Sequence, residues 1–222
     1  LSTTIDMGER TIRRETTFLK EAGFIDIDSS GMVVTPQGEV LIEGLKDFMH
    51  ELMGLHELEQ KVADILNLKQ VIIVPDNLDE NELVLEDMGK SAAKFLTDVV
   101  KNDSIIAVTG GSSVGAAVRA LPQARLSSNI VVIPARGGIG REVENQANTL
   151  VSILAKKLNG QYRLLHVPDQ LGARAAESLL SEPDIKSVVD VLKKADILVY
   201  GIGRAGEMAR RRNLSPAMID DL

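Results

Sequence analysis

Cysteine and tryptophan are absent from the 222-residue chain, and aromatic residues make up only 3% of it. Without cysteine there can be no disulfide, no catalytic thiolate and no cysteine-based zinc site. With so few aromatic side chains the hydrophobic core must be aliphatic, and a base-stacking binder of single-stranded nucleic acid is disfavoured. Any chemistry must therefore rest on backbone, hydroxyl, amide and charged groups.

Long apolar runs and an excess of positive charge are lacking as well. No stretch approaches the roughly 18 apolar residues of a membrane helix and no signal peptide opens the chain, so we expect a cytoplasmic protein without a membrane partner. The formal net charge of −7 excludes wholesale attraction to nucleic acid, and any DNA contact needs a local basic patch. The chain opens on Leu1 rather than Met, and we expect the natural protein to begin earlier.

The most informative segment runs from Thr109 to Ser113 and reads Thr-Gly-Gly-Ser-Ser. It follows an apolar run predicted as a buried strand and precedes small residues predicted as a helix. Glycines let backbone N–H groups approach a ligand, a helix N-terminus offers unpaired donors with partial positive charge, and serine hydroxyls add donors. The segment predicts a phosphate-binding turn at Gly110, Gly111, Ser112 and Ser113. The alternative is a tight turn in which a serine only caps the helix.

The first fifty residues have the pattern of a winged helix-turn-helix. Residues 1–6 can form a helix, residues 6–8 a turn, and residues 9–22 a second helix that ends at Gly23. Two alternating segments around Ser29-Ser30-Gly31 predict a hairpin, the wing. Pro36 then opens a long helix whose apolar stripe is typical of a dimer or linker helix. We expect the first helix of the module to be missing from this chain.

The second helix carries the candidate DNA-binding residues. Recognition helices read bases from their first turns, where this helix has Arg10, Thr11, Arg13 and Arg14. Arginine can contact guanine in a bidentate manner or clamp a phosphate. The alternative is a solvated face of a surface helix, but the predicted wing favours double-stranded DNA as a partner.

A second helical stretch predicts a linker, so we divide the chain into a DNA-binding domain (1–53), a helical linker (54–69) and a large domain (70–222). His50 and His56 lie on this connection. No carboxylate or further histidine completes an obvious ligand pattern, so we interpret both as surface residues and expect no metal site.

The large domain alternates apolar runs with helical stretches. Strands are predicted at 71–75, 105–108, 130–134, 162–168 and 197–200, and helices at 82–100, 143–158 and 185–194. Continuous apolar strands between helices indicate a Rossmann-like α/β fold, with a parallel sheet covered on both faces. Ligands of such sheets bind at the carboxyl ends of the strands.

Three of the predicted strands are followed by glycine-rich turns, and one of these turns contains Arg136. Gln146 opens the next helix with an amide that can bond hydroxyls, and residues 210–212 form an arginine triplet. One anionic group at Gly110–Ser113, another near Arg136 or the triplet, and hydroxyls near Gln146 describe a sugar phosphate or bisphosphate. The alternative for each loop alone is ordinary turn geometry.

Several motifs together resemble the SorC-type family of sugar-responsive bacterial transcriptional repressors. They are 107–113 (AVTGGSS), 134–138 (PARGG), 145–149 (NQANT), 162–165 (YRLL), 201–203 (GIG) and 208–213 (MARRRN). The resemblance covers essentially the whole chain. It implies a homodimeric or homotetrameric repressor of glycolytic genes, without a cofactor, whose effector domain is similar to sugar-phosphate isomerases and deaminases and whose inducer is fructose-1,6-bisphosphate.

The same resemblance assigns phosphate and sugar contacts to Gly110, Gly111, Ser112, Ser113, Arg136, Gln146 and Arg211. This sequence departs from the family pattern at Arg204, where such proteins commonly carry an acidic residue. The family also uses a glutamate and a lysine nearer its C-terminus, and we expect these, with the last strands, to lie beyond Leu222.

An enzyme on the same fold, a sugar-phosphate isomerase or deaminase, is the competing hypothesis. It would need a general base near the sugar, for which Asp169 and His166 are the candidates. Asp169 is interpreted as a helix cap and His166 as a packed strand residue. Because a free enzyme has no use for a winged helix, we expect no enzymatic activity.

Overall fold

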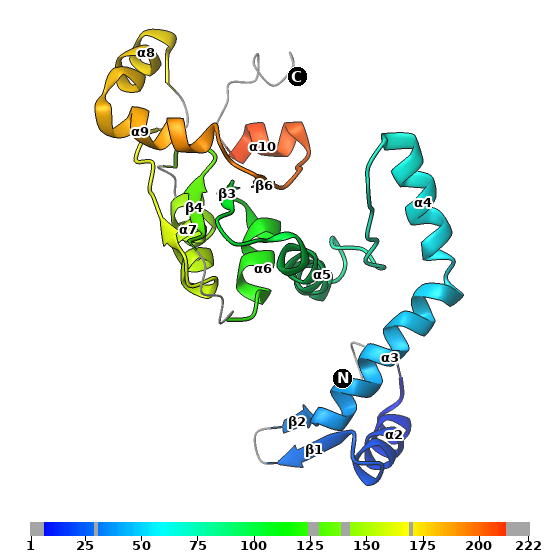
Figure 1. The fold of residues 1–222 in the computed structure, drawn as a ribbon. Helices are drawn as coiled ribbons and strands as arrows, with labels where there is room; N and C mark the ends of the chain where they lie inside the picture. The colour runs from blue at the N-terminus through cyan, green and yellow to red at the C-terminus, as the bar shows by residue number, and fades with distance from the viewer. Residues whose placement is uncertain (1–6, 29–30, 124–128, 139–142, 169–170, 212–222) are drawn as a thin grey trace. The chain divides into compact units, whose positions relative to one another are not determined.

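A computed structural model describes residues 7–28, 31–123, 129–138, 143–168 and 171–211 (Figure 1). The chain separates into two compact units, Leu1–Ile73 and Val74–Leu222, and each is described by itself. The finer domain boundaries at residues 53 and 69 stay predictions. Among the described residues, no helix is long and apolar enough to cross a bilayer.

The first unit begins with helix α2 (Glu9–Glu21), which matches the predicted second helix. Gly23 ends it in the left-handed region, at φ +79°, a conformation that glycine adopts without steric cost. The N–H groups of Gly23 and Phe24 donate to the carbonyls of Lys20 (3.0 Å) and Leu19 (2.9 Å). This pair of bonds satisfies the last carbonyls of the helix and turns the chain sharply. The predicted preceding helix, residues 1–6, lies outside the described residues.

The predicted wing is confirmed as an antiparallel hairpin of β1 (Ile25–Asp28) and β2 (Gly31–Val34). Helix α3 (Pro36–Leu52) follows directly, with proline in its first turn and Thr35 as its cap. The Thr35 hydroxyl accepts from Gly38 N–H (3.1 Å) and donates to the Gly23 carbonyl (2.6 Å), so one side chain joins α2 to α3. A side chain at Gly38 would collide with the Phe24 carbonyl, so glycine allows α3 to pack on the base of the hairpin.

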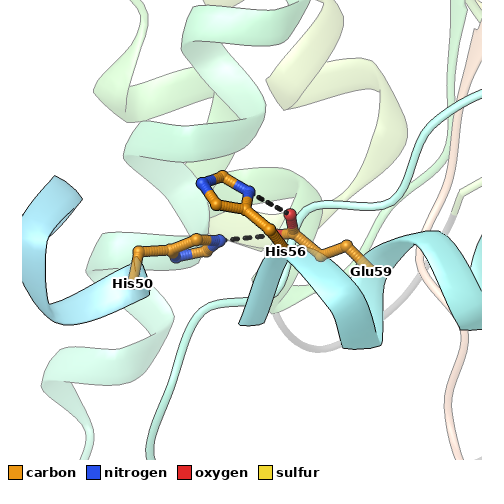
Figure 2. A group of neighbouring side chains, drawn as sticks. All are labelled: His50, His56 and Glu59. Atoms are coloured by element: carbon orange, nitrogen blue, oxygen red, sulfur yellow. Dashed lines mark hydrogen bonds and ion pairs between the residues drawn. The ribbon is translucent and has the colours of Figure 1, made fainter. Parts of the chain in front are cut away.

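Helix α4 (Leu55–Leu66) follows α3 after a turn at Gly54, whose φ is +65°. The turn brings His50 of α3 beside His56 and Glu59 of α4 (Figure 2). The strand predicted at residues 71–75 is wrong, because these residues form no strand in the structure. The Ile73 N–H donates instead to the Glu59 carboxylate at 2.7 Å, which replaces a strand partner with a side chain of α4.

The second unit contains a parallel four-stranded sheet in the order β5-β4-β3-β6, which confirms the predicted α/β class. Its strands are β3 (Ile105–Val108), β4 (Val131–Pro134), β5 (Gln161–Tyr162) and β6 (Ile197–Val199). β5 is far shorter than the predicted strand over 162–168. The reason is Asn148, whose side-chain amide bonds both the N–H and the carbonyl of Leu165 at 3.0 Å and so substitutes for a strand partner.

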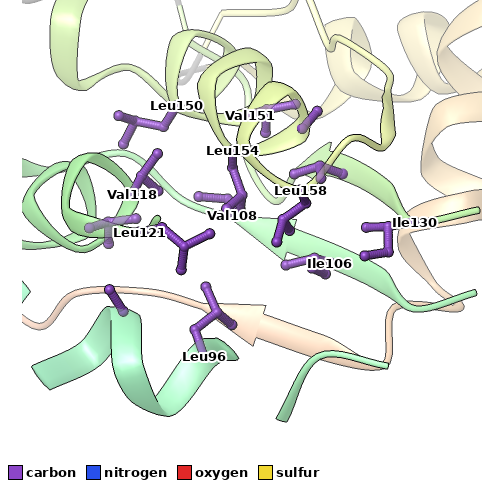
Figure 3. Packing of buried hydrophobic residues seen from close by; sticks show 14 residues of the cluster. Leu96, Ile106, Val108, Val118, Leu121, Ile130, Leu150, Val151, Leu154 and Leu158 are labelled. Atoms are coloured by element: carbon purple, nitrogen blue, oxygen red, sulfur yellow. The ribbon is translucent and has the colours of Figure 1, made fainter. Parts of the chain in front are cut away.

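Seven helical segments accompany the sheet within the described residues. They are α5 (Leu83–Val99), α6 (Ser112–Ala120), η1 (Val143–Asn145), α7 (Ala147–Lys157), α8 (Ala173–Ser181), α9 (Pro183–Leu192) and α10 (Ala205–Arg211). Residues Ile106, Val108 and Val132 are fully buried against apolar side chains of α5, α6 and α7 (Figure 3). Ala107 and Ile133 point to the opposite face and are buried too, where α9 contacts β3 and β4. Both faces of the central strands are therefore covered, as their continuous apolar sequence predicts.

Candidate functional site

The turn after β3 is built around two glycines with different tasks. A Cβ at Gly110 would lie 2.7 Å from the Asn145 carbonyl oxygen, so glycine permits the start of α7 to approach this turn. Gly111 has φ +122° and ψ 158°, which side-chain-bearing residues rarely adopt. Its N–H donates to the same Asn145 carbonyl at 2.9 Å. The glycines thus lock the turn against the segment that leads into α7.

The alternative interpretation, in which a serine caps the helix, is wrong. Gly111 is the N-cap of α6 without a side-chain cap, and Ser112 and Ser113 are the first two helical residues. The first intrahelical bond is donated by Gly115 N–H to the Gly111 carbonyl at 2.9 Å. The amides of Ser112, Ser113 and Val114 precede that bond, in the part of a helix where N–H groups have no intrahelical acceptor. Both hydroxyls are therefore available beside a cluster of donors suited to an anion.

The loop after β4 holds half-buried Arg136, and it lies near the opening of α7. A side chain at Gly137 would collide with the Val167 carbonyl, so glycine lets this loop pack on the segment after β5. A Cβ at Gly138 would lie 3.9 Å from both Cβ and Oε1 of Gln146. Since Gln146 follows Asn145 directly, the Arg136 loop and the Gly110 turn both lie next to the segment around these two residues.

The loop after β6 completes this edge of the sheet. A Cβ at Gly201 would lie 3.7 Å from Val114 Cγ2, which puts the loop against the first turn of α6. Strand order also reverses here, because β4 lies on one side of β3 and β6 on the other. Such reversal points open a crevice at the carboxyl ends of parallel strands. The structure therefore gathers Gly110, Gly111, Ser112, Ser113, Arg136 and Gln146 around one edge.

The structure does not place the remaining candidate residues at this edge of the sheet. Arg211 is the last residue of α10, but its side chain lies outside the described residues, as do residues 212–222. Arg204, the departure from the family pattern, pairs with Glu207 (3.1 Å) and Asp79 (3.5 Å) and is 70% exposed. Of the two candidate general bases, Asp169 lies outside the described residues. His166 is exposed beyond the end of β5, so its interpretation as a packed strand residue is wrong.

The candidate DNA-binding residues all lie in the first half of α2. Arg10, Arg13 and Arg14 are exposed and Thr11 is half-buried. Arg13 pairs with Glu9 and Arg14 with Glu15, each at 2.7 Å, and both arginine side chains are 79% exposed. Exposed pairs of this kind contribute little to stability, so the guanidinium groups can exchange them for phosphates at small cost.

A third group of polar side chains was missed by the sequence interpretation. Glu59 Oε1 lies 3.0 Å from His50 Nε2, and Glu59 Oε2 lies 3.4 Å from His56 Nδ1 (Figure 2). His56 is exposed as expected, but the side chain of His50 is only 20% exposed and that of Glu59 only 14%. The three-residue spacing from His56 to Glu59, which places both on one helix face, was the signal in the sequence.

The environment of Glu59 favours its charged form. Burial by itself raises the pKa of this carboxyl group. The hydrogen bond from Ile73 N–H, the charge that His50 carries when protonated, and the hydrogen bonds from both imidazoles act in the opposite direction. Together they outweigh burial, and the pKa of Glu59 lies below its ordinary value.

Two family models match the chain, one for each predicted activity. The family described as "Putative sugar-binding domain" matches residues 50–222. The family described as "CggR N-terminal DNA binding domain" matches residues 1–49.

Named relatives cover nearly all of the chain. A central glycolytic genes regulator from Bacillus subtilis (strain 168) is 40% identical over 96% of this chain and 63% of its own length. Its counterpart from Priestia megaterium is 38% identical over 99% of this chain and 65% of its own length. The chain thus spans less than two thirds of either relative. A solved structure of a SorC family transcriptional regulator from Enterococcus faecalis has a TM-score of 0.66 and 33% identity, covering 74% of this chain and 68% of that one.

Proposed function

Because the chain belongs to the SorC family of transcriptional regulators, we propose that it is a DNA-binding repressor of glycolytic genes controlled by a sugar phosphate. Fructose-1,6-bisphosphate is the proposed effector and double-stranded operator DNA the proposed partner. The observation that carries the proposal is the joining of two modules in one chain. A helix and wing of DNA-binding type precede a parallel sheet whose carboxyl edge gathers an anion-binding turn and an arginine loop.

The effector half of the proposal rests on the chemistry of the gathered groups. One phosphate binds at the α6 N-terminus, held by the amides and hydroxyls of Ser112 and Ser113 beside Gly110 and Gly111. A second phosphate is met by Arg136 and by Arg211. The Gln146 amide, next to the Arg136 loop, bonds sugar hydroxyls between the two phosphates.

The DNA half rests on α2. Arg10, Thr11, Arg13 and Arg14 contact base edges and phosphates in the major groove. The helix has four basic residues, but also Glu9, Glu15 and Glu21, so the basic character is local to its first half. Charge therefore supports site-specific docking rather than general attraction to DNA.

Homodimer or homotetramer formation is part of the same proposal, because repressors commonly bind paired half-sites as dimers. Helix α3 supports it with large apolar side chains that are exposed in the single chain, including Val40, Leu45, Phe48 and Leu52. Exposed apolar patches of this kind mark interaction sites.

The test of function uses phosphorus NMR and operator binding on the same sample. Fructose-1,6-bisphosphate mixed with the protein and followed for hours should give broadened or shifted resonances without new phosphorus signals. In fluorescence anisotropy, the protein should bind a labelled promoter fragment of a glycolytic operon, and fructose-1,6-bisphosphate should lower that affinity. New phosphorus signals would instead establish turnover and restore the hypothesis of an isomerase or deaminase. If the phosphorus resonances stay unchanged and operator binding does not respond to fructose-1,6-bisphosphate, the proposed effector is wrong.

A further inference from the structure

We propose that His50, His56 and Glu59 form a binding site for a transition-metal ion at the junction of α3 and α4, and that Zn²⁺ is the ion that fits it best. The site goes beyond the proposed function, since it shares no residue with the sugar-phosphate edge or with α2. Within the part of the chain that the structure describes, this is the group of histidine and carboxylate side chains whose ligand atoms converge, all within 4.8 Å of one another.

The donor set selects the kind of ion. Two imidazoles and one carboxylate are the protein ligands of many open zinc sites, which keep a further position for water or another ligand. Imidazole nitrogen suits zinc, copper and nickel, whereas Ca²⁺ and Mg²⁺ require predominantly oxygen ligands. A three-ligand His₂Glu set therefore argues for a transition metal and against the hard cations.

Each imidazole nitrogen lies close to a different oxygen of the Glu59 carboxylate, so an ion held by one of these oxygens requires the carboxylate or one imidazole to rotate. In a tetrahedral site with bonds of about 2.0–2.1 Å, neighbouring ligand atoms lie about 3.3 Å apart. His50 Nε2 and Glu59 Oε1 are 3.0 Å apart, and His56 Nδ1 and Glu59 Oε2 are 3.4 Å apart. The imidazole rings, 4.7 Å apart between centroids and inclined at 61°, both point toward the carboxylate (Figure 2).

The surroundings hold the carboxylate in place as outer-shell partners of metal ligands do. The Ile73 N–H donates to Glu59 Oε1 at 2.7 Å, which orients the group and leaves Oε2 toward His56. Burial of His50 and Glu59 lowers the local dielectric, while His56, 72% exposed, leaves an entry path from solvent.

The position of the site gives the ion a structural consequence. His50 lies at the end of α3, His56 and Glu59 lie in the first turns of α4, and Gly54 turns the chain between them. A bound ion would join two helices that otherwise meet through a short turn and hydrogen bonds. It would therefore stabilise the α3–α4 junction by the free energy of binding to the folded chain.

Calorimetric titration of ZnCl₂ into the untagged, chelator-treated chain tests the site. We expect one ion per chain in a saturable isotherm, and a dissociation constant at least about tenfold weaker in both His50→Ala and His56→Ala. Glu59→Gln retains an oxygen that can accept from Ile73 N–H and should show a similar loss without unfolding. The third histidine of the chain supplies the matched control, because His166→Ala should bind Zn²⁺ like the original chain.

Cobalt replaces zinc in a second measurement that does not depend on stability. Co²⁺ should develop tetrahedral visible absorption bands with the original chain and His166→Ala, but not with His56→Ala. His56 is largely exposed, so that variant retains its fold and its result is decisive. The proposal is overturned if the chain shows no saturable Zn²⁺ binding, if His50→Ala and His56→Ala bind as tightly as the original chain, or if His166→Ala loses binding equally.

Discussion

Arg136 contributes a full positive charge at an edge where the α6 N-terminus supplies only partial charge. In Arg136→Ala we expect the affinity for fructose-1,6-bisphosphate to fall about 10- to 100-fold, because a charge-assisted hydrogen bond contributes roughly 1.5–3 kcal/mol. Calorimetric titration measures the change. Arg174→Ala, at an exposed position of α8, is the matched control and should keep the original affinity for fructose-1,6-bisphosphate. Arg136→Ala should keep the original affinity for operator DNA. If both variants bound fructose-1,6-bisphosphate with equal affinity, Arg136 would not contribute to effector binding and the proposed site would be wrong.

Arg13 and Arg14 are held by exposed ion pairs that DNA phosphates can replace. In Arg13→Ala and Arg14→Ala we expect weaker operator binding at every salt concentration. The slope of log affinity against log salt should become shallower by about one for each phosphate that the variant no longer neutralises. Anisotropy titrations across a potassium chloride series measure both quantities. Lys20→Ala, at the far end of the same helix, should behave like the original chain, and full affinity in both arginine variants would contradict the assignment of α2 as the recognition helix.

At the scale of single residues, the residue types near the Gly110 turn restrict the backbone conformation without determining it. The alternative interpretation of this turn makes a serine the helix cap, but Gly111 takes that position through a backbone conformation that glycine alone adopts readily. The cap depends on φ and ψ, which the residue types only restrict. The hydroxyls consequently stand in the first turn of α6, a position equally suited to an anion.

The end of β5 shows how one side chain can decide the length of an element. The Asn148 amide satisfies the N–H and the carbonyl of Leu165, a buried residue. Asn148→Ala leaves both backbone groups without these partners, at a cost of roughly 1–3 kcal/mol for each buried group. We therefore expect Asn148→Ala to lower the free energy of unfolding by about 2–6 kcal/mol, measured by urea denaturation followed by circular dichroism.

The matched control for that loss is Asn102→Ala, at an exposed turn in the same unit. It should change the free energy of unfolding by less than about 0.5 kcal/mol. If the two variants had equal stability, the Asn148 bonds would not contribute to the stability of this unit.

Elements whose start or end has a local sequence signal are predicted accurately. Helix α2 ends where Gly23 predicts, and α3 begins at Pro36 as expected. The segment wrongly predicted as a strand, 71–75, and the part of 162–168 beyond β5 have backbone groups that bond to helix side chains, those of Glu59 and Asn148. Pairing of this kind depends on distant residues, and apolar composition cannot reveal it.

At the scale of the whole molecule, a repressor requires coupling between effector and operator. Linkage demands that fructose-1,6-bisphosphate and operator DNA weaken each other's binding by the same factor, which we expect to lie between about 5 and 150. Effector affinity measured with and without saturating operator gives one factor, and operator affinity with and without effector gives the other. In Arg136→Ala, operator binding should persist while the response to effector disappears. Unequal factors would show that the two ligands do not share one equilibrium.

The sequence by itself determined the order of the modules, the class of the large domain and the groups that could meet an anion. These follow from periodicity, glycine placement and charge, all of which are local properties of the chain. Only the tertiary structure decided that the Gly110 turn and the Arg136 loop flank the same segment at Gln146, and that His50, His56 and Glu59 converge. The physical reason is that strand order and helix packing bring together residues far apart in sequence, and no local pattern encodes the distances between them.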